Sequence, residues 1–317
     1  MAACYSQEKF NVTSYNTMAF VIITLQTFAG MWINGFIVSV LCVASVKKKI
    51  FNSNEKIVLF LGCCRLGDLC ITWVFSFLSI IYPHCFYVHP IPQMFSGLRS
   101  FLNSTNVWVS ACLCVFYCIK IANFQHTSFI YLKVKIDRIL PGLFLVSVLF
   151  ALVMGILAYD ITYRVVFKNL NSTIPGNLWN THVTMDEHTF ALFCINGFIS
   201  TTAFMTVIFS LLLLLFSLWR HKHRMQANSM RNLSMDAHTK AIKSILSFIF
   251  IYSINFTGFI LTMIYARMME YRLIFLILIS QYVLPIVHSL ILIFSNPKLE
   301  KMFLRTLSCL KWELYKE

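Results

Sequence analysis

The stretch RILPGLFLVSVLFALVMGILA, residues 138–158, decides the fold of this chain. It carries a charge only at its first residue, Arg138, and is apolar on every helical face. About 20 mainly apolar residues in a helix cross the hydrocarbon core of a bilayer, because each residue adds 1.5 Å. The stretch therefore predicts a transmembrane helix.

Similar apolar stretches occur on both sides of residues 138–158. Hydrophobic residues make up 58% of the sequence and charged residues 12%, whereas a soluble domain carries about 25% charged residues. We expect an all-α bundle of seven transmembrane helices, forming a single domain over 1–317, with a short cytoplasmic amphipathic helix at 298–310. The expected spans are 18–46, 56–82, 93–122, 138–158, 188–219, 239–266 and 273–295, and the apolar face of the last helix holds Leu299, Met302, Phe303 and Leu307.

Lysine and arginine are distributed unevenly over the connections, and cytoplasmic loops carry the excess of these residues. Most lie at 47–56, 120–138, 220–243 and 298–316, whereas the opposite side holds Lys9, Arg164, Lys168, Arg267 and Arg272. We therefore expect a multi-pass plasma-membrane protein with its N-terminus outside and its C-terminus in the cytoplasm. The net charge of +14 suits anionic membrane lipid, and we expect no nucleic-acid binding, because no soluble domain would carry it.

The segments expected outside hold few modification signals. The first 17 residues lack the apolar core of a cleaved signal peptide, so the first span is expected to direct insertion. Asn11 and Asn171 begin glycosylation sequons there. Cys4 and Cys85 are the candidate disulfide pair, since an oxidising compartment permits one.

Polar residues follow one face of the third span. Arg99, Asn103, Asn106 and Ser110 recur at helical spacing. Polar groups inside spans usually face protein or water. Two interpretations remain open: Arg99 and Asn103 line a ligand cavity near the outer mouth, or the face is a seam that bonds neighbouring helices, with Arg99 snorkelling to the interface.

A second set of polar residues is expected to form a structural core. Arg65 lies near the middle of the second span, where an arginine costs roughly 2.5–3.5 kcal/mol on insertion scales. Asp68, three residues later, can pair with it, and Asn34 can add a hydrogen bond. In the seventh span, Pro285 is expected to kink the helix, and His288 and Ser289 complete the set of Asn34, Arg65, Asp68, Pro285, His288 and Ser289.

Other positions complete the candidate cavity. Gln281 lies one turn outward of Pro285, and Asn255 lies at a depth comparable to that of Asn103. Neither a catalytic motif, nor a phosphate loop, nor metal-ligand spacing occurs in the sequence, so we expect no enzyme activity, no cofactor and no metal site.

Six motifs resemble those of the bitter taste receptors, the type 2 taste receptor family of G protein-coupled receptors. FYCIKIANF and HSLILIFSNPKL are similar to the signatures that replace two motifs of other receptors in this fold class. In chain order the motifs are GMWINGFIV (30–38), Arg65-Leu66 with Trp73, FYCIKIANF (116–124), LWRHKHRMQ (218–226), HTKAIK (238–243) and HSLILIFSNPKL (288–299).

The resemblance implies a receptor that binds small bitter compounds in a cavity on the extracellular side and activates a heterotrimeric G protein of the gustducin or Gi type. It places Leu278 beside Arg99, Asn103, Asn255 and Gln281 at pocket positions. Arg99 would favour anionic ligands, because a guanidinium forms bidentate pairs with carboxylates. The residues expected at the G-protein mouth are Tyr117, Lys120, Arg220, His221, His238, Lys240 and Lys243.

Two other classes remain as alternatives. A vomeronasal type 1-like pheromone receptor has the same architecture, but the motifs of the third and seventh spans argue against it. A small-molecule transporter would usually show more acidic residues inside the bilayer than Asp68 alone. Oligomeric state does not follow from the sequence.

Overall fold

The computed structural model describes residues 2–48, 52–82, 89–122, 124, 126–171, 187–227, 242–243, 245–258, 260–261 and 271–314. In several stretches, including 2–16, 165–171, 187–196 and 271–282, it describes the backbone alone. Cys4 and the sequon residues Asn11 and Asn171 belong to these backbone-only stretches, and Cys85 lies outside the described residues. The disulfide and the glycosylation sites therefore stay predictions.

The described chain is helical throughout its main elements. These are α1 (Ala2–Lys48), α2 (Ser53–Ile81), α4 (Ile91–Ile121), α5 (Thr127–Asn171), α6 (Glu187–Ala227), α8 (Tyr271–Ser295) and α9 (Pro297–Leu314). A further apolar helix, Ile245–Gly258, lies between α6 and α8. Five of the helices are long and apolar enough to cross a membrane, and Ile245–Gly258 and Val283–Ser295 are shorter apolar helices.

The helices outrun the expected spans at several ends. α1 begins at Ala2 rather than at residue 18, and α5 covers 45 residues where 138–158 was expected. Both extensions contain polar residues and lie beyond the expected spans. A helix can continue past the hydrocarbon core of the membrane where no residue in its sequence breaks it. α8 continues as a helix through Pro285 and ends at Ser295 before Pro297 begins α9.

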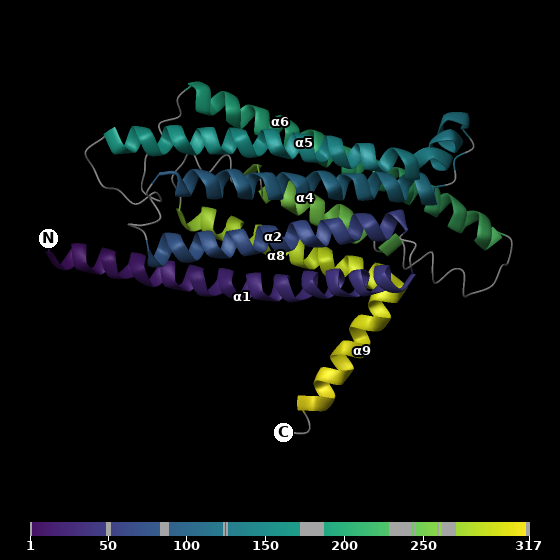
Figure 1. Cartoon of the computed structure of the whole chain (residues 1–317), viewed down its shortest axis with the longest axis horizontal. Helices are drawn as coiled ribbons and strands as arrows, with labels where there is room; N and C mark the ends of the chain where they lie inside the picture. The colour runs from purple at the N-terminus through teal and green to yellow at the C-terminus, as the bar shows by residue number, and fades with distance from the viewer. Residues whose placement is uncertain are drawn as a thin grey trace.

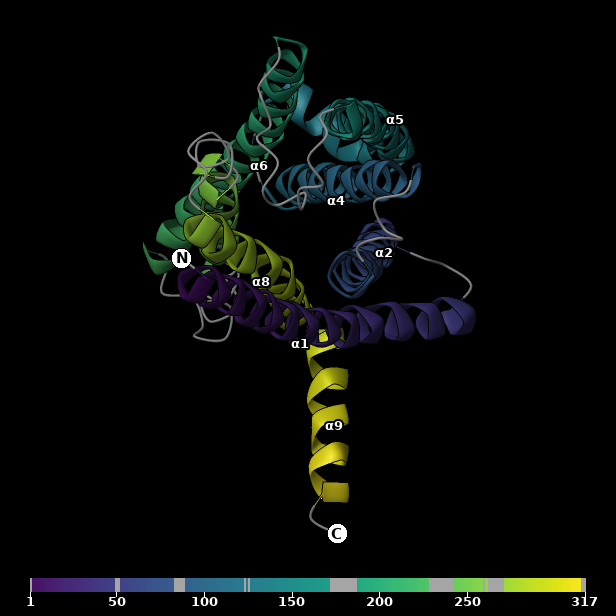
Figure 2. The same cartoon turned by 90° about the vertical axis from the view of Figure 1, so that its left-hand side faces the viewer.

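The long helices lie side by side as a bundle, and α9 turns away from it (Figure 1). Figure 2 shows α9 projecting from the bundle beneath α1. α4 holds a central place, since it contacts α2, α5 and α6, and α1 contacts α2, α8 and α9. We name the end where α1, α4, α6 and α8 finish the basic end, because Lys120, Arg220 and Lys298 lie there.

The apolar core gathers in the half of the bundle nearest the basic end. The residues that are almost fully buried come from the last part of α1, the first part of α2, the last parts of α4 and α6, and the start of α9. They include Leu41, Leu61, Leu113, Leu214 and Leu299. Side chains that point away from the core are large and apolar, as in α5, where Leu149 and Val153 are about half exposed. Such an outer surface suits lipid rather than water.

The amphipathic helix α9 splits its expected apolar face. Leu299 and Phe303 are buried, whereas Met302 and Leu307 are exposed. The Phe303 ring lies 5.2 Å from Phe36 and 5.9 Å from Trp32, so the first turns of α9 are fixed to α1. Leu299 and Phe303 thus pack on the bundle, and the placement of the exposed Met302 and Leu307 in the membrane interface stays a prediction.

Candidate functional site

A cavity of about 140 Å³ lies between α4, α6 and the helix Ile245–Gly258, in the half away from the basic end. Its wall combines hydroxyl and amide groups with aromatic rings. The polar lining residues are Ser100, Asn103, Ser104, Ser200, Tyr252 and Asn255, and the apolar ones include Val107, Trp108, Ala203, Phe204, Val207 and Phe256. Sites for small molecules are usually largely apolar with a few placed polar groups, as here.

The two asparagines predicted from the sequence meet in this cavity. Asn103 comes from α4 and Asn255 from the facing helix, so one ligand can contact both. The Phe204 and Phe256 rings stack at 4.2 Å and fix the distance between α6 and that helix. Ala203, which is fully buried beside Phe204, leaves the free volume that a larger side chain would fill.

Sequence analysis missed the aromatic wall. Trp108 stacks at 5.6 Å on Phe150 of α5, which holds its ring at the edge of the cavity. Ser104 and Trp108 are four residues apart, next to the polar face of α4. That spacing was the available signal, but aromatic residues are so common in this chain that it did not stand out.

Arg99 is not among the described residues that line this cavity. Its side chain is half-buried, and its positive charge acts on the carboxylate of Asp68 in α2. Asp68 lies against protein, and its buried Oδ1 has no hydrogen-bond partner in the part of the chain that the structure describes. The side chains of Leu278 and Gln281, the other predicted ligand positions, lie outside the described residues.

Arg65 joins three helices in the middle of the bundle. Its Nε donates to Asn106 Oδ1 of α4 at 3.0 Å, and its Nη1 donates to Ser289 Oγ of α8 at 2.7 Å. Its Nη2 lies 2.5 Å from His288 Nδ1, which must accept, since a guanidinium has only donors. The predicted pairing of Arg65 with Asp68 was wrong, because the guanidinium reaches acceptors on neighbouring helices instead.

The remaining members of this polar layer extend it to α1. Ser289 Oγ lies 2.8 Å from Asn34 Oδ1, and Asn34 Nδ2 donates to the Gly30 carbonyl at 2.9 Å. Asn34 thus reaches Arg65 through Ser289 rather than directly. The His288 ring packs edge-on against Tyr252, 5.2 Å away, so the layer touches a residue of the cavity wall.

In the described part of the chain, two ion pairs join helices at the basic end. Lys120 Nζ lies 2.6 Å from Asp137 Oδ2, joining the end of α4 to α5, and Lys298 Nζ lies 3.1 Å from Glu55 Oε1, joining α9 to α2. Hydrogen bonds from Lys120 and Ser53 hold the pKa of Asp137, which precedes the expected span, below its usual range. These acidic partners, Asp137 and Glu55, were not singled out in the sequence.

The other residues predicted for the basic end are only partly described. Tyr117 is partly exposed and lies beside Asn54 at the start of α2. Arg220 and Lys243 are exposed, and the side chain of His221 is outside the described part of the chain, as are all of His238 and Lys240.

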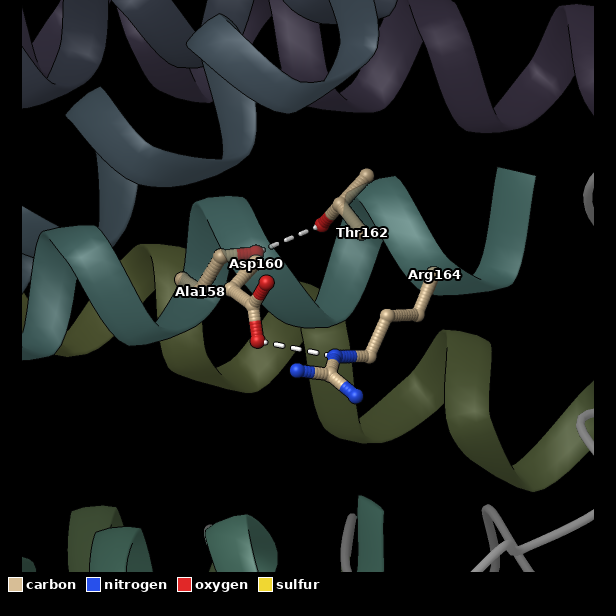
Figure 3. A network of polar contacts seen from close by, with 4 residues as sticks. All are labelled: Ala158, Asp160, Thr162 and Arg164. Atoms are coloured by element: carbon tan, nitrogen blue, oxygen red, sulfur yellow. Dashed lines mark hydrogen bonds and ion pairs between the residues drawn. The ribbon is translucent and has the colours of Figure 1, made fainter. Parts of the chain in front are cut away.

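The opposite end of α5 is held by its own side chains. Arg164 Nε lies 2.9 Å from Asp160 Oδ2, one turn earlier, and Thr162 Oγ1 lies 2.8 Å from the Ala158 carbonyl (Figure 3). The Thr162 hydroxyl also lies 2.8 Å from that of Ser96, which ties α5 to α4 near the cavity. In the described residues no three His, Cys, Asp or Glu side chains come together as a metal site would require.

This arrangement of helices corresponds to a known seven-helix fold. Squid rhodopsin matches it with a TM-score of 0.62 over 94% of this chain and 87% of that chain, at 10% sequence identity, a likeness that shows the fold of a seven-helix G protein-coupled receptor. The family model of the taste receptor protein (TAS2R) matches residues 12–311. The chain therefore belongs to the TAS2R family of bitter taste receptors and is a multi-pass membrane protein, not an enzyme.

Relatives cover nearly the whole chain. Human taste receptor type 2 member 9 is 30% identical over 89% of this chain and 90% of its own length. Gorilla taste receptor type 2 member 8 is 31% identical over 92% of this chain and 95% of its own length. Human taste receptor type 2 member 2 is 29% identical over 93% of this chain and 96% of its own length.

Proposed function

We propose that this receptor binds a small bitter compound in the cavity between α4, α6 and Ile245–Gly258 and activates a gustducin- or Gi-type G protein at its basic end. The observation that carries the proposal is the cavity wall, in which Asn103 and Asn255 lie among aromatic rings from three helices. Amides supply both donors and acceptors, and the rings supply stacking area.

The described cavity is smaller than the usual range of about 300–1,000 Å³ for small-molecule sites. It would hold one part of a ligand, with Leu278, Gln281 and Arg99 proposed for the remainder. Arg99 keeps its proposed preference for anionic ligands, and Asp68 would weaken it, because the carboxylate offsets the guanidinium charge.

We place the protein in the plasma membrane in this proposal. Its N-terminus and the cavity would lie on the extracellular side, and its basic end would lie in the cytoplasm. The support for this topology is the concentration of lysine and arginine at one end of the bundle. A G protein would insert where the ends of the helices separate, beside Tyr117, Lys120, Arg220 and Lys243.

A screen of bitter compounds with a calcium readout tests the proposal in cells that express the full chain and a chimeric G protein. For an agonist found there, Asn255→Leu should raise the half-maximal concentration by about tenfold, the effect of losing about 1.4 kcal/mol of hydrogen bonding. Thr257→Val is the matched control, since Thr257 is exposed on the same helix and its hydroxyl donates to the Ser253 carbonyl one turn earlier. Equal responses of the two variants would contradict the cavity assignment.

A further inference from the structure

A second recess lies on the outer surface of the bundle, near the basic end. Among the described residues, this groove of about 390 Å³ is lined by the apolar side chains of Leu212, Leu215, Phe216, Trp219, Ile242 and Leu246. It is separate from the ligand cavity, because the two share no residue. The proposed receptor function does not use the apolar groove itself, although Arg220 and Lys243 beside it also belong to the proposed G-protein mouth.

The groove opens on the outer surface of the bundle, which would face lipid in a membrane. Leu212, Phe216 and Trp219 are about half exposed and recur at helical spacing along one face of α6, while their neighbours Leu211, Leu214 and Leu218 are buried. From Leu212 to Trp219 the helix rises roughly 10 Å, a length over which an extended hydrocarbon chain can lie. Trp219 stands at the end nearest the membrane surface, where tryptophan is favoured.

The rim of the groove at the basic end is cationic. Arg220 follows Trp219, Lys243 follows Ile242, and both are exposed. In the part of the chain that the structure describes, neither forms an ion pair, in contrast to Lys120 and Lys298. The sequence from 188 to 269 contains one acidic residue, Asp236.

An apolar groove with a cationic rim at the membrane surface matches one chemical class of occupant, a phospholipid with an anionic headgroup. We infer that such a lipid binds here, with an acyl chain in the groove and its phosphate between Arg220 and Lys243. It would bridge α6 and Ile245–Gly258. The inference depends on the proposed topology only for the choice of leaflet, since anionic lipid is concentrated on the cytoplasmic side.

Fluorescence quenching in lipid nanodiscs tests this inference on the full chain. Phospholipids with brominated acyl chains quench a nearby tryptophan, and the Trp219 signal is the difference between the chain and its Trp219→Phe variant. Brominated phosphatidylserine should occupy the groove with a roughly 30-fold preference over brominated phosphatidylcholine, as expected for two surface cations. Equal quenching by the two lipids would overturn the inference, because it would show only a general lipid coat.

Two variants separate the headgroup from the chain. Arg220→Gln with Lys243→Gln should abolish the preference, whereas Lys301→Gln with Arg305→Gln, which removes the same charge from exposed positions of α9, should keep it. Leu246→Phe, which narrows the groove at a half-exposed position, should reduce quenching by the brominated chain. A preference that survives the first pair of changes would overturn the headgroup site.

Competition distinguishes a lipid from a free phosphate compound. Glycerophosphoserine, which carries the headgroup without acyl chains, should not displace brominated phosphatidylserine at equal concentration. Displacement would overturn the role of the groove. Because the readout needs neither agonist nor G protein, its failure would leave the proposed receptor function untouched, and the reverse also holds.

Discussion

The two halves of the bundle are built differently. The half nearest the basic end is filled by large aliphatic side chains and closed by ion pairs between helices. The opposite half holds the cavity and several buried polar atoms without a hydrogen-bond partner among the described residues, including Thr24 Oγ1, Asp68 Oδ1 and both polar atoms of Gln93. The Arg65 layer lies between them. One half is thus closely packed, whereas the other contains a cavity and buried polar atoms.

The largest expected effect concerns the layer that separates the halves. Arg65→Leu removes three hydrogen bonds between helices, each worth about 0.6–1.7 kcal/mol in a membrane protein, so the free energy of unfolding should fall by about 2–5 kcal/mol. Thermal unfolding of the receptor in detergent measures it. Arg164→Leu, which loses a bond within one helix, should change stability little. Similar losses in both would remove the special role of the layer.

The close contact of α4 and α5 in the cavity half gives the next effect. A Cβ at Gly97 would lie 3.0 Å from the Gly155 carbonyl oxygen, so Gly97→Ala must push the helices apart, at a cost of about 1–3 kcal/mol. Gly142→Ala is the control, because nothing lies within 4 Å of its Cβ position. The midpoint of thermal unfolding should be lower for Gly97→Ala than for Gly142→Ala. Equal midpoints would show that α4 and α5 can move apart at this contact at little cost.

Changes at Arg99 and Asp68, on neighbouring helices, should alter ligand preference rather than stability. Arg99→Ala should weaken responses to acidic agonists by about tenfold relative to neutral ones, the effect of about 1.4 kcal/mol. Asp68→Asn should act in the opposite direction, because it removes the charge that offsets Arg99. Concentration–response curves for acidic and neutral agonists measure both. An equal reduction for the two agonist types in Arg99→Ala would exclude a ligand role.

The smallest effect is expected at the basic end. Asp137→Asn breaks a half-exposed ion pair, which contributes no more than about 1 kcal/mol. The pKa of Asp137 is lower in the folded chain than in the unfolded chain. The ion pair therefore contributes to stability above the pKa of Asp137 in the unfolded chain, and this contribution is lost as pH falls through the pKa of Asp137 in the folded chain. The stability difference between the chain and Asp137→Asn should therefore stay constant from neutral to mildly acidic pH. A difference that already disappears in mildly acidic buffer would contradict the pair.

Sequence reasoning reached the fold because hydrophobic length and loop charge are local properties. The sequence also pointed to Asn103, Asn255, Arg65 and His288, since a polar side chain inside a membrane span usually faces protein or water rather than lipid. Sequence reasoning failed where the partner lies on another helix. Arg65 was assigned to Asp68, its neighbour in sequence, although its acceptors Asn106, His288 and Ser289 are 41, 223 and 224 positions away.

The attachment of α9 has a mechanical consequence. Phe303 is wedged among Trp32 and Phe36 of α1 and Phe294 of α8, and Lys298 is tethered to Glu55 of α2. Because the first turns of α9 are fixed to α1, α2 and α8, the remainder of α9 would move together with these helices. A slight sliding of α8 past α1 would swing its free tip through a wide arc, so a fluorophore on Cys309, which is exposed, would magnify that displacement into an optical signal.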